Sequence, residues 1–469
     1  MTNSSIGCAI APVILSLLVI LCTRRATLGL LSGFSLGAFL YLYHNTNHHP
    51  LAYLTTTIQE TISNPWHYST LIFTSLLGGF ASLLQRGGGL EQLFRKTLTP
   101  KAFQIRVMSL GLMCFFDGLA NCLLIGKIGA PMADRLKIPR EKIAYIADTT
   151  SSAVACLAPI SSWIAMQLAL IGVVLMERGI DTSPYTCFLR SIPCNFYCIS
   201  CVAFMIFTVA TKDFGPMAKA TPLPYEPNVN HVDTQQRSIF PPVISILSLL
   251  LSIPVIYYLM EIDEKLPITG QKLGIALGGD SGPTVFIITG FISNLILFIL
   301  SSRLTVAERT KSLLKGIKQM LIPLTVLLSA WLFSAVLKDL GLGMLLSQFL
   351  GESFPLKFAP LIVFSFGCLL SFTTGTSWGT MALLFPLVFG ALGELPDPVF
   401  MQALPLLTGA IFSGAVFGDH CSPYSDTTIV CAVATECTPY NHVKTQLPYA
   451  LIPGVISGSL FAVIGAIAL

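Results

Sequence analysis

The sequence FGDHCSPYSDTT, residues 417–428, interrupts an apolar run that extends from about residue 404 to residue 434. The run is long enough to cross a bilayer, which takes about 20 apolar residues. Ionisable side chains at membrane depth cost roughly 2.5 to 3.5 kcal/mol each, so a cluster of them is expected to face protein or water and to serve function. Pro423 removes a helical hydrogen bond and clashes with the preceding turn. The stretch therefore predicts a helix that is broken inside the membrane, where freed backbone groups can hold ions or small substrates.

The composition is that of a polytopic membrane protein. Hydrophobic residues make up 53% of the 469 and charged residues only 11%, against roughly 25% in a soluble domain. The net charge is +4, and the 27 Lys and Arg fall in short clusters between apolar runs. Such clusters are typical of loops that set membrane orientation and not of a nucleic-acid surface. The 13 cysteines lie mostly within apolar runs without metal-type spacing and are expected to be small buried hydrophobes.

The positions of Lys and Arg predict the topology. Basic clusters at 86–106 and 133–142 flank an apolar stretch, so both clusters belong on the cytoplasmic side and the stretch enters and leaves from there. It is expected to form a re-entrant hairpin with Asp117 and Gly118 near its tip. By the same reasoning a second hairpin enters from outside, with residues 373–379 at its tip. Both termini are expected outside.

The expected fold is an all-α membrane protein with about ten transmembrane helices, two re-entrant hairpins and broken helices at the midplane. An odd number of crossings in each half makes the two halves inverted repeats, an architecture of many secondary transporters. A break is expected around 148–152 and again at Pro159. The expected boundaries are 1–211 for the first half, with its hairpin at 107–132 and its broken helix at 143–175; 212–238 for a proline-rich cytoplasmic linker; and 239–469 for the second half, with its hairpin at 359–391 and its broken helix at 401–436.

Five stretches resemble the NhaC-type Na⁺/H⁺ antiporter family. They are GDHCSPYSDTT at 418–428, HVKTQLPY at 442–449, GTSWGT at 375–380, REKIAYIADTT at 140–150 and APISSW at 158–163. Members of this family exchange a cytoplasmic cation for protons, and some exchange organic acids or amino acids. The resemblance implies a transporter and not an enzyme, in the plasma membrane, and specifically in the bacterial inner membrane.

The first hairpin departs from the family pattern. Family members often carry a second Asp directly after the position of Asp117, and a small polar residue further along the hairpin. Here these positions hold Gly118 and Lys127. A buried lysine can pair with an acid and take the place of a bound cation, so sodium coupling at this hairpin is in question.

Carboxylates carry the predicted coupling, because one carboxylate can hold either Na⁺ or a proton. Asp419, His420 and Asp426 are expected to take part in proton coupling, and Na⁺ is expected at Asp148 and Asp426. The structural alternative is that the acids cap half-helices and that His420 donates to a backbone carbonyl. The remaining predicted ligands are Asp117, Thr149, Thr150, Thr374, Thr376, Ser377, Ser422, Ser425 and Thr427. His442 and Lys444 are interpreted as anchors at the inner membrane edge.

The sequence thus predicts a secondary transporter that exchanges Na⁺ for H⁺ by alternating access, with no cofactor beyond the transported ions. One alternative is an ion-coupled exchanger or symporter of a small organic acid or amino acid, which Lys127 and the positive ends of half-helices favour. Another is an intramembrane hydrolase that uses Asp419, His420 and Asp426 with a metal or Ser422. The expected partners are Na⁺, H⁺ or a small organic solute and the lipid bilayer, without nucleic acid; the choice between a monomer and a homodimer stays open.

Overall fold

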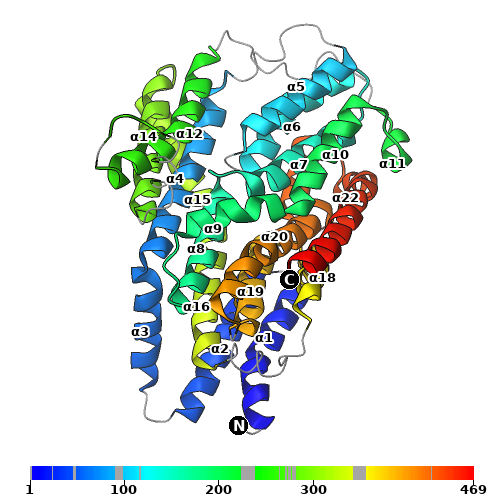
Figure 1. Ribbon diagram of the computed structural model, residues 1–469. Coiled ribbons are helices and arrows are strands. Elements are labelled where there is room, and N and C mark those ends of the chain that lie inside the picture. The colour runs from blue at the N-terminus through cyan, green and yellow to red at the C-terminus, as the bar shows by residue number, and fades with distance from the viewer. Residues whose placement is uncertain are drawn as a thin grey trace.

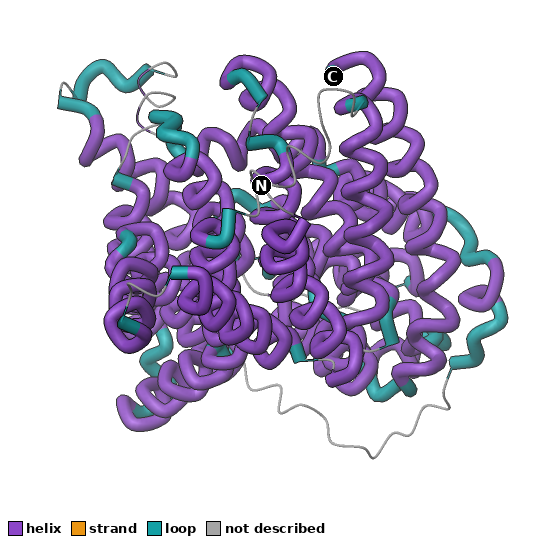
Figure 2. Tube along the Cα trace, turned by 90° about the horizontal axis from the view of Figure 1, so that it is seen from below, coloured by secondary structure: helices purple, strands orange, loops and turns teal. Residues whose placement is uncertain are grey.

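The computed structural model of this chain is a bundle of helices, seen from the side in Figure 1 and from below in Figure 2. Within the described residues there is no strand. The structure describes residues 3–23, 25–45, 49–89, 99–115, 118–222, 238–263, 265–269, 272, 276, 281–341, 355–393, 395–423 and 425–469. Within these ranges the side chains at a few helical positions, among them Lys127 and Asp426, are not described.

The described helices fall into two groups, before and after residues 219–239. Those of the first part are α1 (Asn3–Thr23), α2 (Ala26–His44), α3 (Pro50–Ser63), α4 (Pro65–Gly87), α5 (Pro100–Met113), α6 (Gly118–Arg135), α7 (Arg140–Leu157), α8 (Ser162–Glu177), α9 (Pro184–Ser191), η2 (Ile192–Cys194), α10 (Phe196–Ala210) and α11 (Gly215–Ala218). Those of the second part are α12 (Phe240–Glu261), α14 (Gly282–Leu300), α15 (Val306–Gln319), α16 (Leu321–Asp339), η3 (Leu356–Phe358), α18 (Ala359–Thr374), α19 (Ser377–Ala391), α20 (Asp397–Cys421), α21 (Asp426–Ala434) and α22 (Pro439–Ala468).

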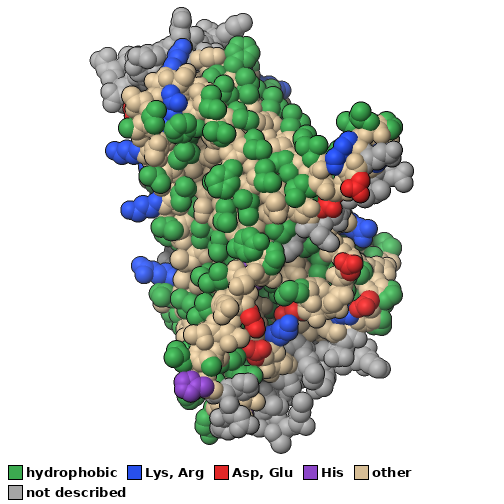
Figure 3. Space-filling model, turned by 90° about the vertical axis from the view of Figure 1, so that its left-hand side faces the viewer, with side chains coloured by type: hydrophobic (Ala, Val, Ile, Leu, Met, Phe, Trp, Pro, Cys, Tyr) green, Lys and Arg blue, Asp and Glu red, His purple; other side chains and the backbone are tan. Residues whose placement is uncertain are grey.

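Eight helical segments in the described part of the chain are long and apolar enough to cross a bilayer. The face shown in Figure 3 is covered largely by hydrophobic side chains, with charged groups at its edges and near one end. Large apolar side chains such as Leu251 of α12 and Leu295 of α14 are 59% and 60% exposed, as lipid-facing residues would be. The predicted all-α polytopic membrane fold is confirmed.

Helix α20 lies in the interior of this bundle. In the most apolar 18-residue stretch of α20, 78% of the residues are buried, against 28% in that of α22. The stretch FGDHC at the end of α20 is therefore surrounded by protein, with α7, α10, α18 and α22 against it. The neighbouring helices therefore separate the polar side chains of this stretch from the hydrocarbon of the bilayer.

The expected break at 148–152 is wrong, because α7 runs without interruption from Arg140 to Leu157. The hydroxyls that suggested a break are satisfied inside the helix: Thr150 donates to the carbonyl of Ile146, and Ser151 and Ser152 donate to that of Asp148. Ser and Thr can remain in a helix by bonding to a carbonyl three or four residues earlier. The chain does break between α7 and α8, next to Pro159.

The central break lies at residues 422–425, between α20 and α21. Two helical hairpins flank it. In the first, α5 ends at Met113 and α6 begins at Gly118, and the expected tip residue Asp117 lies outside the described residues. In the second, α18 and α19 are joined at Gly375, whose φ of +68° favours glycine. Both pairs lie where the hairpins at 107–132 and 359–391 are expected, although α5 begins earlier, at Pro100.

Two further helices lie between apolar ones. Helix α3 lies between α2 and α4, and α15 carries the basic residues after Arg303. Helix α15 begins with a capping box, in which the Thr305 hydroxyl and the Glu308 carboxylate satisfy each other's backbone amides. Its small residue Gly316 packs directly on the backbone of α4, so the basic run is part of the helical bundle.

Candidate functional site

The second hairpin is fastened to the end of α20. Gly418 lies against the backbone of Ser371 and Phe372, and a side chain at Gly418 would overlap these atoms. The Ser371 hydroxyl donates to the carbonyl of Ala415 at 2.5 Å, and the Ser422 hydroxyl donates to that of Phe372 at 2.7 Å. Glycine at 418 is thus required for close approach of the hairpin. These contacts fix the orientation of the two residues that follow, Asp419 and His420.

Asp148 is the centre of the site. Its side chain projects from the middle of α7 and is fully buried. Its Oδ2 accepts three hydrogen bonds: from Gln446 Nε2 at 2.8 Å, from Thr428 Oγ1 at 3.2 Å and from His442 Nε2 at 3.1 Å. Its Oδ1 has no hydrogen-bond partner among the described residues. One carboxylate oxygen is held by donors from α21 and α22, while the other is available to a ligand.

Asp419 lies next to this cluster and is 3% exposed. Its Oδ1 accepts from the Ser425 hydroxyl at 2.7 Å, and Ser425 in turn is 2.9 Å from the Thr427 hydroxyl. Thr428 links the two acids, since its hydroxyl lies 3.1 Å from the carbonyl of Asp419 and also reaches Asp148. Ser425, at the central break, and Thr427 and Thr428, at the start of α21, therefore place hydroxyl oxygens beside two buried carboxylates.

His420 is fully buried and has a partner on each ring nitrogen. Its Nε2 lies 2.9 Å from the Thr149 hydroxyl and its Nδ1 lies 2.9 Å from the Tyr197 hydroxyl. The side-chain amide of Gln446 donates to its backbone carbonyl. Because each hydroxyl can donate or accept, the ring can occupy either neutral tautomer without losing a hydrogen bond. The ring thus lies between α7 and α10 and contacts the residue that directly follows Asp148.

The structure does not bring all the predicted site residues together. The hydroxyls of Thr150, Thr374 and Ser422 bond to backbone carbonyls, and Thr376 caps α19 by accepting from the amide of Gly379. Ser377 is buried at the second hairpin. Asp117 and the side chains of Asp426 and Lys127 lie outside the described residues. The described cluster consists of Asp148, Thr149, Asp419, His420, Ser425, Thr427, Thr428, His442 and Gln446.

The interpretation of His442 as a membrane-edge anchor is wrong, because the residue is completely buried against Asp148. Gln446, which donates to the same carboxylate, was not among the predicted site residues. Both lie on α22, one turn apart, and so present their side chains on one face of the helix. That spacing was the available signal: an apolar helix has little other reason to carry two polar groups on the same face. Lys444 is exposed, as expected of an edge residue.

Two ion-pair networks hold the start of α7, about two turns before Asp148. Arg140 forms a two-pronged contact with Asp134 at 3.0 and 2.7 Å and also contacts Glu436 at 2.5 Å. Lys142 is fully buried and contacts Asp213 Oδ1 at 2.6 Å. Both residues were counted among the charges of a cytoplasmic loop, whereas Arg140 begins α7 and Lys142 lies in its first turns. They join α7 to α6 and to the segments that follow α10 and α21.

A disulfide joins Cys122 of α6 to Cys431 of α21. This differs from the expectation that the cysteines are only small buried side chains. Gly126, one turn further along α6, packs against Ala434 of α21. The first hairpin is therefore in direct contact with the helix that follows the central break, which carries Thr427 and Thr428.

The donor set of the site suits a hard monovalent cation. No group of three His, Cys, Asp or Glu side chains that could hold a metal ion occurs in the part of the chain that the structure describes. Asp148 Oδ1 and Gln446 Oε1 are buried without a hydrogen-bond partner among the described residues, and the Thr428 hydroxyl of α21 contacts the same carboxylate. Carboxylate, amide and hydroxyl oxygens are ligands for hard cations, not for soft transition metals.

The sequence matches a family model and several relatives, two of which are named as antiporters. The family model described as "Na+/H+ antiporter family" matches residues 154–466. A protein of uncharacterised function from Haemophilus influenzae is 30% identical over 97% of this chain and 90% of its own length. The malate-2H(+)/Na(+)-lactate antiporter of Bacillus subtilis is 40% identical over 23% of this chain and 21% of the relative. The arginine/ornithine antiporter ArcD of Halobacterium salinarum is 37% identical over 24% of this chain and 22% of the relative.

The fold matches a solved transporter. The crystal structure of the YdaH transporter of Alcanivorax borkumensis superposes with a TM-score of 0.63. It covers 88% of each chain at 15% sequence identity, a level at which the likeness concerns the fold alone.

Proposed function

The chain belongs to the Na⁺/H⁺ antiporter family and is a secondary transporter, and from this premise we propose that it exchanges Na⁺ for H⁺. One observation carries the proposal. Asp148 is fully buried, and its Oδ1 has no hydrogen-bond partner among the described residues. A carboxylate oxygen in this situation attracts a positive charge, because an uncompensated buried anion is costly. Either a proton or Na⁺ supplies that charge.

Exchange follows from competition for this oxygen. When Asp148 is ionised, its Oδ1 and the Oε1 of Gln446 offer oxygen ligands to Na⁺, and the donors on Oδ2 hold the carboxylate in place. When Oδ1 is protonated, the site loses the negative charge that retains Na⁺. Asp419 with Ser425 supplies a second buried carboxylate beside it. One site that holds either ion, but not both, and faces each side of the membrane in turn couples the two fluxes.

Among the described side chains, the charges around Asp148 favour a cation over an organic anion. The basic side chains Arg140 and Lys142 are engaged with Asp134, Glu436 and Asp213, away from Asp148. The groups around Asp148 are two neutral amide or hydroxyl donors and one imidazole. A second candidate is exchange of a small organic acid or amino acid, which the names of the Bacillus and Halobacterium relatives favour.

We further propose the plasma membrane, specifically a bacterial inner membrane, as the location, with both termini outside. Alternating access would arise from rocking of the two inverted halves, 1–211 and 239–469, against each other. The lipid bilayer surrounds the protein, and no cofactor besides Na⁺ and H⁺ is required. Assembly as a homodimer is compatible with this mechanism but is not needed for it.

A transport assay tests the proposal. The purified protein is reconstituted in vesicles with an acidic interior and a pH-sensitive dye, and is challenged with NaCl, KCl, malate, lactate and arginine. We expect alkalinisation of the interior with Na⁺, its loss in Asp148→Asn, and its retention in Asp181→Asn, which removes an exposed acid between α8 and α9. A response to an organic solute without any response to a cation would reject Na⁺/H⁺ exchange and support the second candidate.

A further inference from the structure

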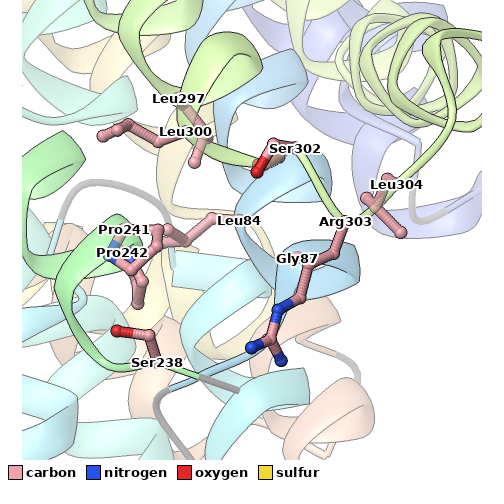
Figure 4. Close-up of a pocket in the computed structure, with 12 residues that line it drawn as sticks. Leu84, Gly87, Ser238, Pro241, Pro242, Leu297, Leu300, Ser302, Arg303 and Leu304 are labelled. Atoms are coloured by element: carbon pink, nitrogen blue, oxygen red, sulfur yellow. The ribbon is translucent and has the colours of Figure 1, made fainter.

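The central site is closed in this structure. Asp148, His420 and Gln446 are fully buried. The pocket drawn in Figure 4 lies at the ends of α4 and α14 and the start of α12, and its described lining residues include none of the cluster around Asp148. That pocket therefore gives no access to the site. Because alternating access requires an opening toward each side of the membrane, contacts that close the site are expected at both ends of the helices that carry it.

Two interrupted helical segments carry the site and run in opposite directions. Helices α7 and α8 form one segment, which contains Asp148, and α20 and α21 form the other. Arg178, directly after α8, contacts Asp397, the first residue of α20. Arg140, the first residue of α7, contacts Glu436, two residues after the end of α21. Each segment thus begins beside the end of the other, and an arginine joins the two segments at both ends.

The contact after α8 is built around one guanidinium group. Arg178 donates to three backbone carbonyls before α20, those of Leu392, Gly393 and Leu395, at 3.2, 2.8 and 2.6 Å. It also donates to Asp397 Oδ1 at 2.8 Å. The side chain of Arg178 is 15% exposed, whereas that of Asp397 is 66% exposed. If the carboxylate moves into water, the guanidinium keeps its carbonyl acceptors.

The contact at the start of α7 has the same design. Arg140 donates to both carboxylate oxygens of Asp134, and it also donates to the carboxylate of Glu436 at 2.5 Å and to the carbonyl of Glu436 at 3.4 Å. The side chains of Arg140 and Asp134 are 14% and 8% exposed, whereas that of Glu436 is 71% exposed. If Glu436 moves away, Arg140 stays paired with Asp134, so no unpaired charge is left inside the protein.

We propose that these two ion pairs are the gates of the transport cycle. The pair of Arg178 and Asp397 separates when the site faces one side of the membrane, and the pair of Arg140 and Glu436 separates when it faces the other. Each pair joins one proposed inverted half to the other, so rocking of the halves that opens one end closes the opposite end. An ion pair with an exposed carboxylate breaks at little cost, because water solvates the released group. The proposal rests on the alternating access of the proposed function, and not on which ion or solute is carried.

Labelling of the native Cys421 from each side of the membrane tests the proposal. Cys421 is fully buried and directly follows His420, so a charged methanethiosulfonate that does not cross membranes reaches it only through an opening. The reagent is added to intact cells and, separately, to inside-out membrane vesicles, both containing the full chain. The modified Cys421 peptide is quantified by mass spectrometry, which separates it from the peptides of the other cysteines.

The two carboxylate variants are expected to open opposite sides. Asp397→Asn should raise the rate of Cys421 modification about two- to fivefold from one side only, and Glu436→Gln should do so from the other side only, because loss of an exposed ion pair allows a factor of this size. Both substitutions are at exposed positions and leave the arginines with their remaining partners, so the fold should be kept. Asp181→Asn removes an exposed acid between α8 and α9 and should match the wild-type protein from both sides.

Two outcomes would overturn the proposal. The first is that Asp397→Asn and Glu436→Gln raise labelling from the same side, or that each raises it equally from both sides. The second is that neither variant differs from Asp181→Asn. Failure of the proposed Na⁺/H⁺ exchange gives a different result: opposite-sided labelling in a protein that does not respond to Na⁺ would support the gates and reject only the choice of ion.

Discussion

The ion pair between Lys142 and Asp213 offers a quantitative test of how α7 is held in the bundle. Lys142 is completely buried, whereas the side chain of Asp213 is 26% exposed. Lys142 Nζ contacts Asp213 at 2.6 Å and the carbonyl of Thr208 at 3.3 Å, and it lies 5.6 Å from the ring centre of Tyr449. The Tyr449 hydroxyl also donates to Asp213, at 3.1 Å. Leaving Lys142 without its partner should therefore cost more free energy than leaving Asp213 without its partner.

Asp213→Asn leaves a buried lysine without its counter-charge. Removing one partner of a buried ion pair costs about 3 to 5 kcal/mol, and partial exposure of Asp213 reduces this to about 2 to 4 kcal/mol here. Lys142→Met keeps the apolar stem and leaves a carboxylate that still has Tyr449 and water, so about 1 to 2 kcal/mol is expected. The double variant should cost less than Asp213→Asn alone, because no charge is left buried and unpaired.

The free energy of unfolding of the purified variants in mixed micelles, measured by titration with a denaturing detergent, gives these differences. The expected order of cost is Asp213→Asn first, with Lys142→Met and the double variant below it. The reasoning is refuted if Asp213→Asn costs no more than Lys142→Met, or if the double variant is the least stable of the three.

Two further predictions concern the central site. Gly418→Val should lower the free energy of unfolding by about 1 to 3 kcal/mol or more, because the valine side chain would overlap the backbone of Ser371 and Phe372. An unchanged midpoint of unfolding in detergent would contradict the close packing of the hairpin on α20. Gln446→Leu removes the 2.8 Å hydrogen bond to Asp148 and one candidate Na⁺ ligand. The Na⁺ concentration for half-maximal transport in vesicles should therefore rise about tenfold or more. Gln402→Leu, at an exposed position on α20, is the control and should leave this concentration unchanged.

The central break was predictable from sequence because Pro423 and its polar neighbours leave few alternatives inside an apolar run. The turn of the second hairpin, at Gly375, falls within the tip expected at 373–379. The continuous α7 was not predicted, because its Ser and Thr hydroxyls bond to carbonyls within the same helix, and sequence does not distinguish this from a break.

The structure brings some of the predicted site residues together. Asp148, Asp419 and His420 lie in one cluster with Thr149, Ser425 and Thr427. His442 was assigned to the membrane edge together with Lys444. The helix α22 begins at Pro439 and turns His442 and Gln446 inward onto Asp148, a contact across nearly 300 residues that no local pattern reveals. Such contacts depend on how whole helices pack.

The central claim is that Na⁺ and a proton compete for Asp148. Calorimetric titration of the purified protein with NaCl between pH 6 and pH 9 tests it directly. The account predicts that the apparent affinity for Na⁺ falls as the pH is lowered, with release of protons on binding at the lower pH values, and that Asp148→Asn abolishes binding. Sodium binding that is independent of pH, or that persists in Asp148→Asn with wild-type affinity, would contradict it.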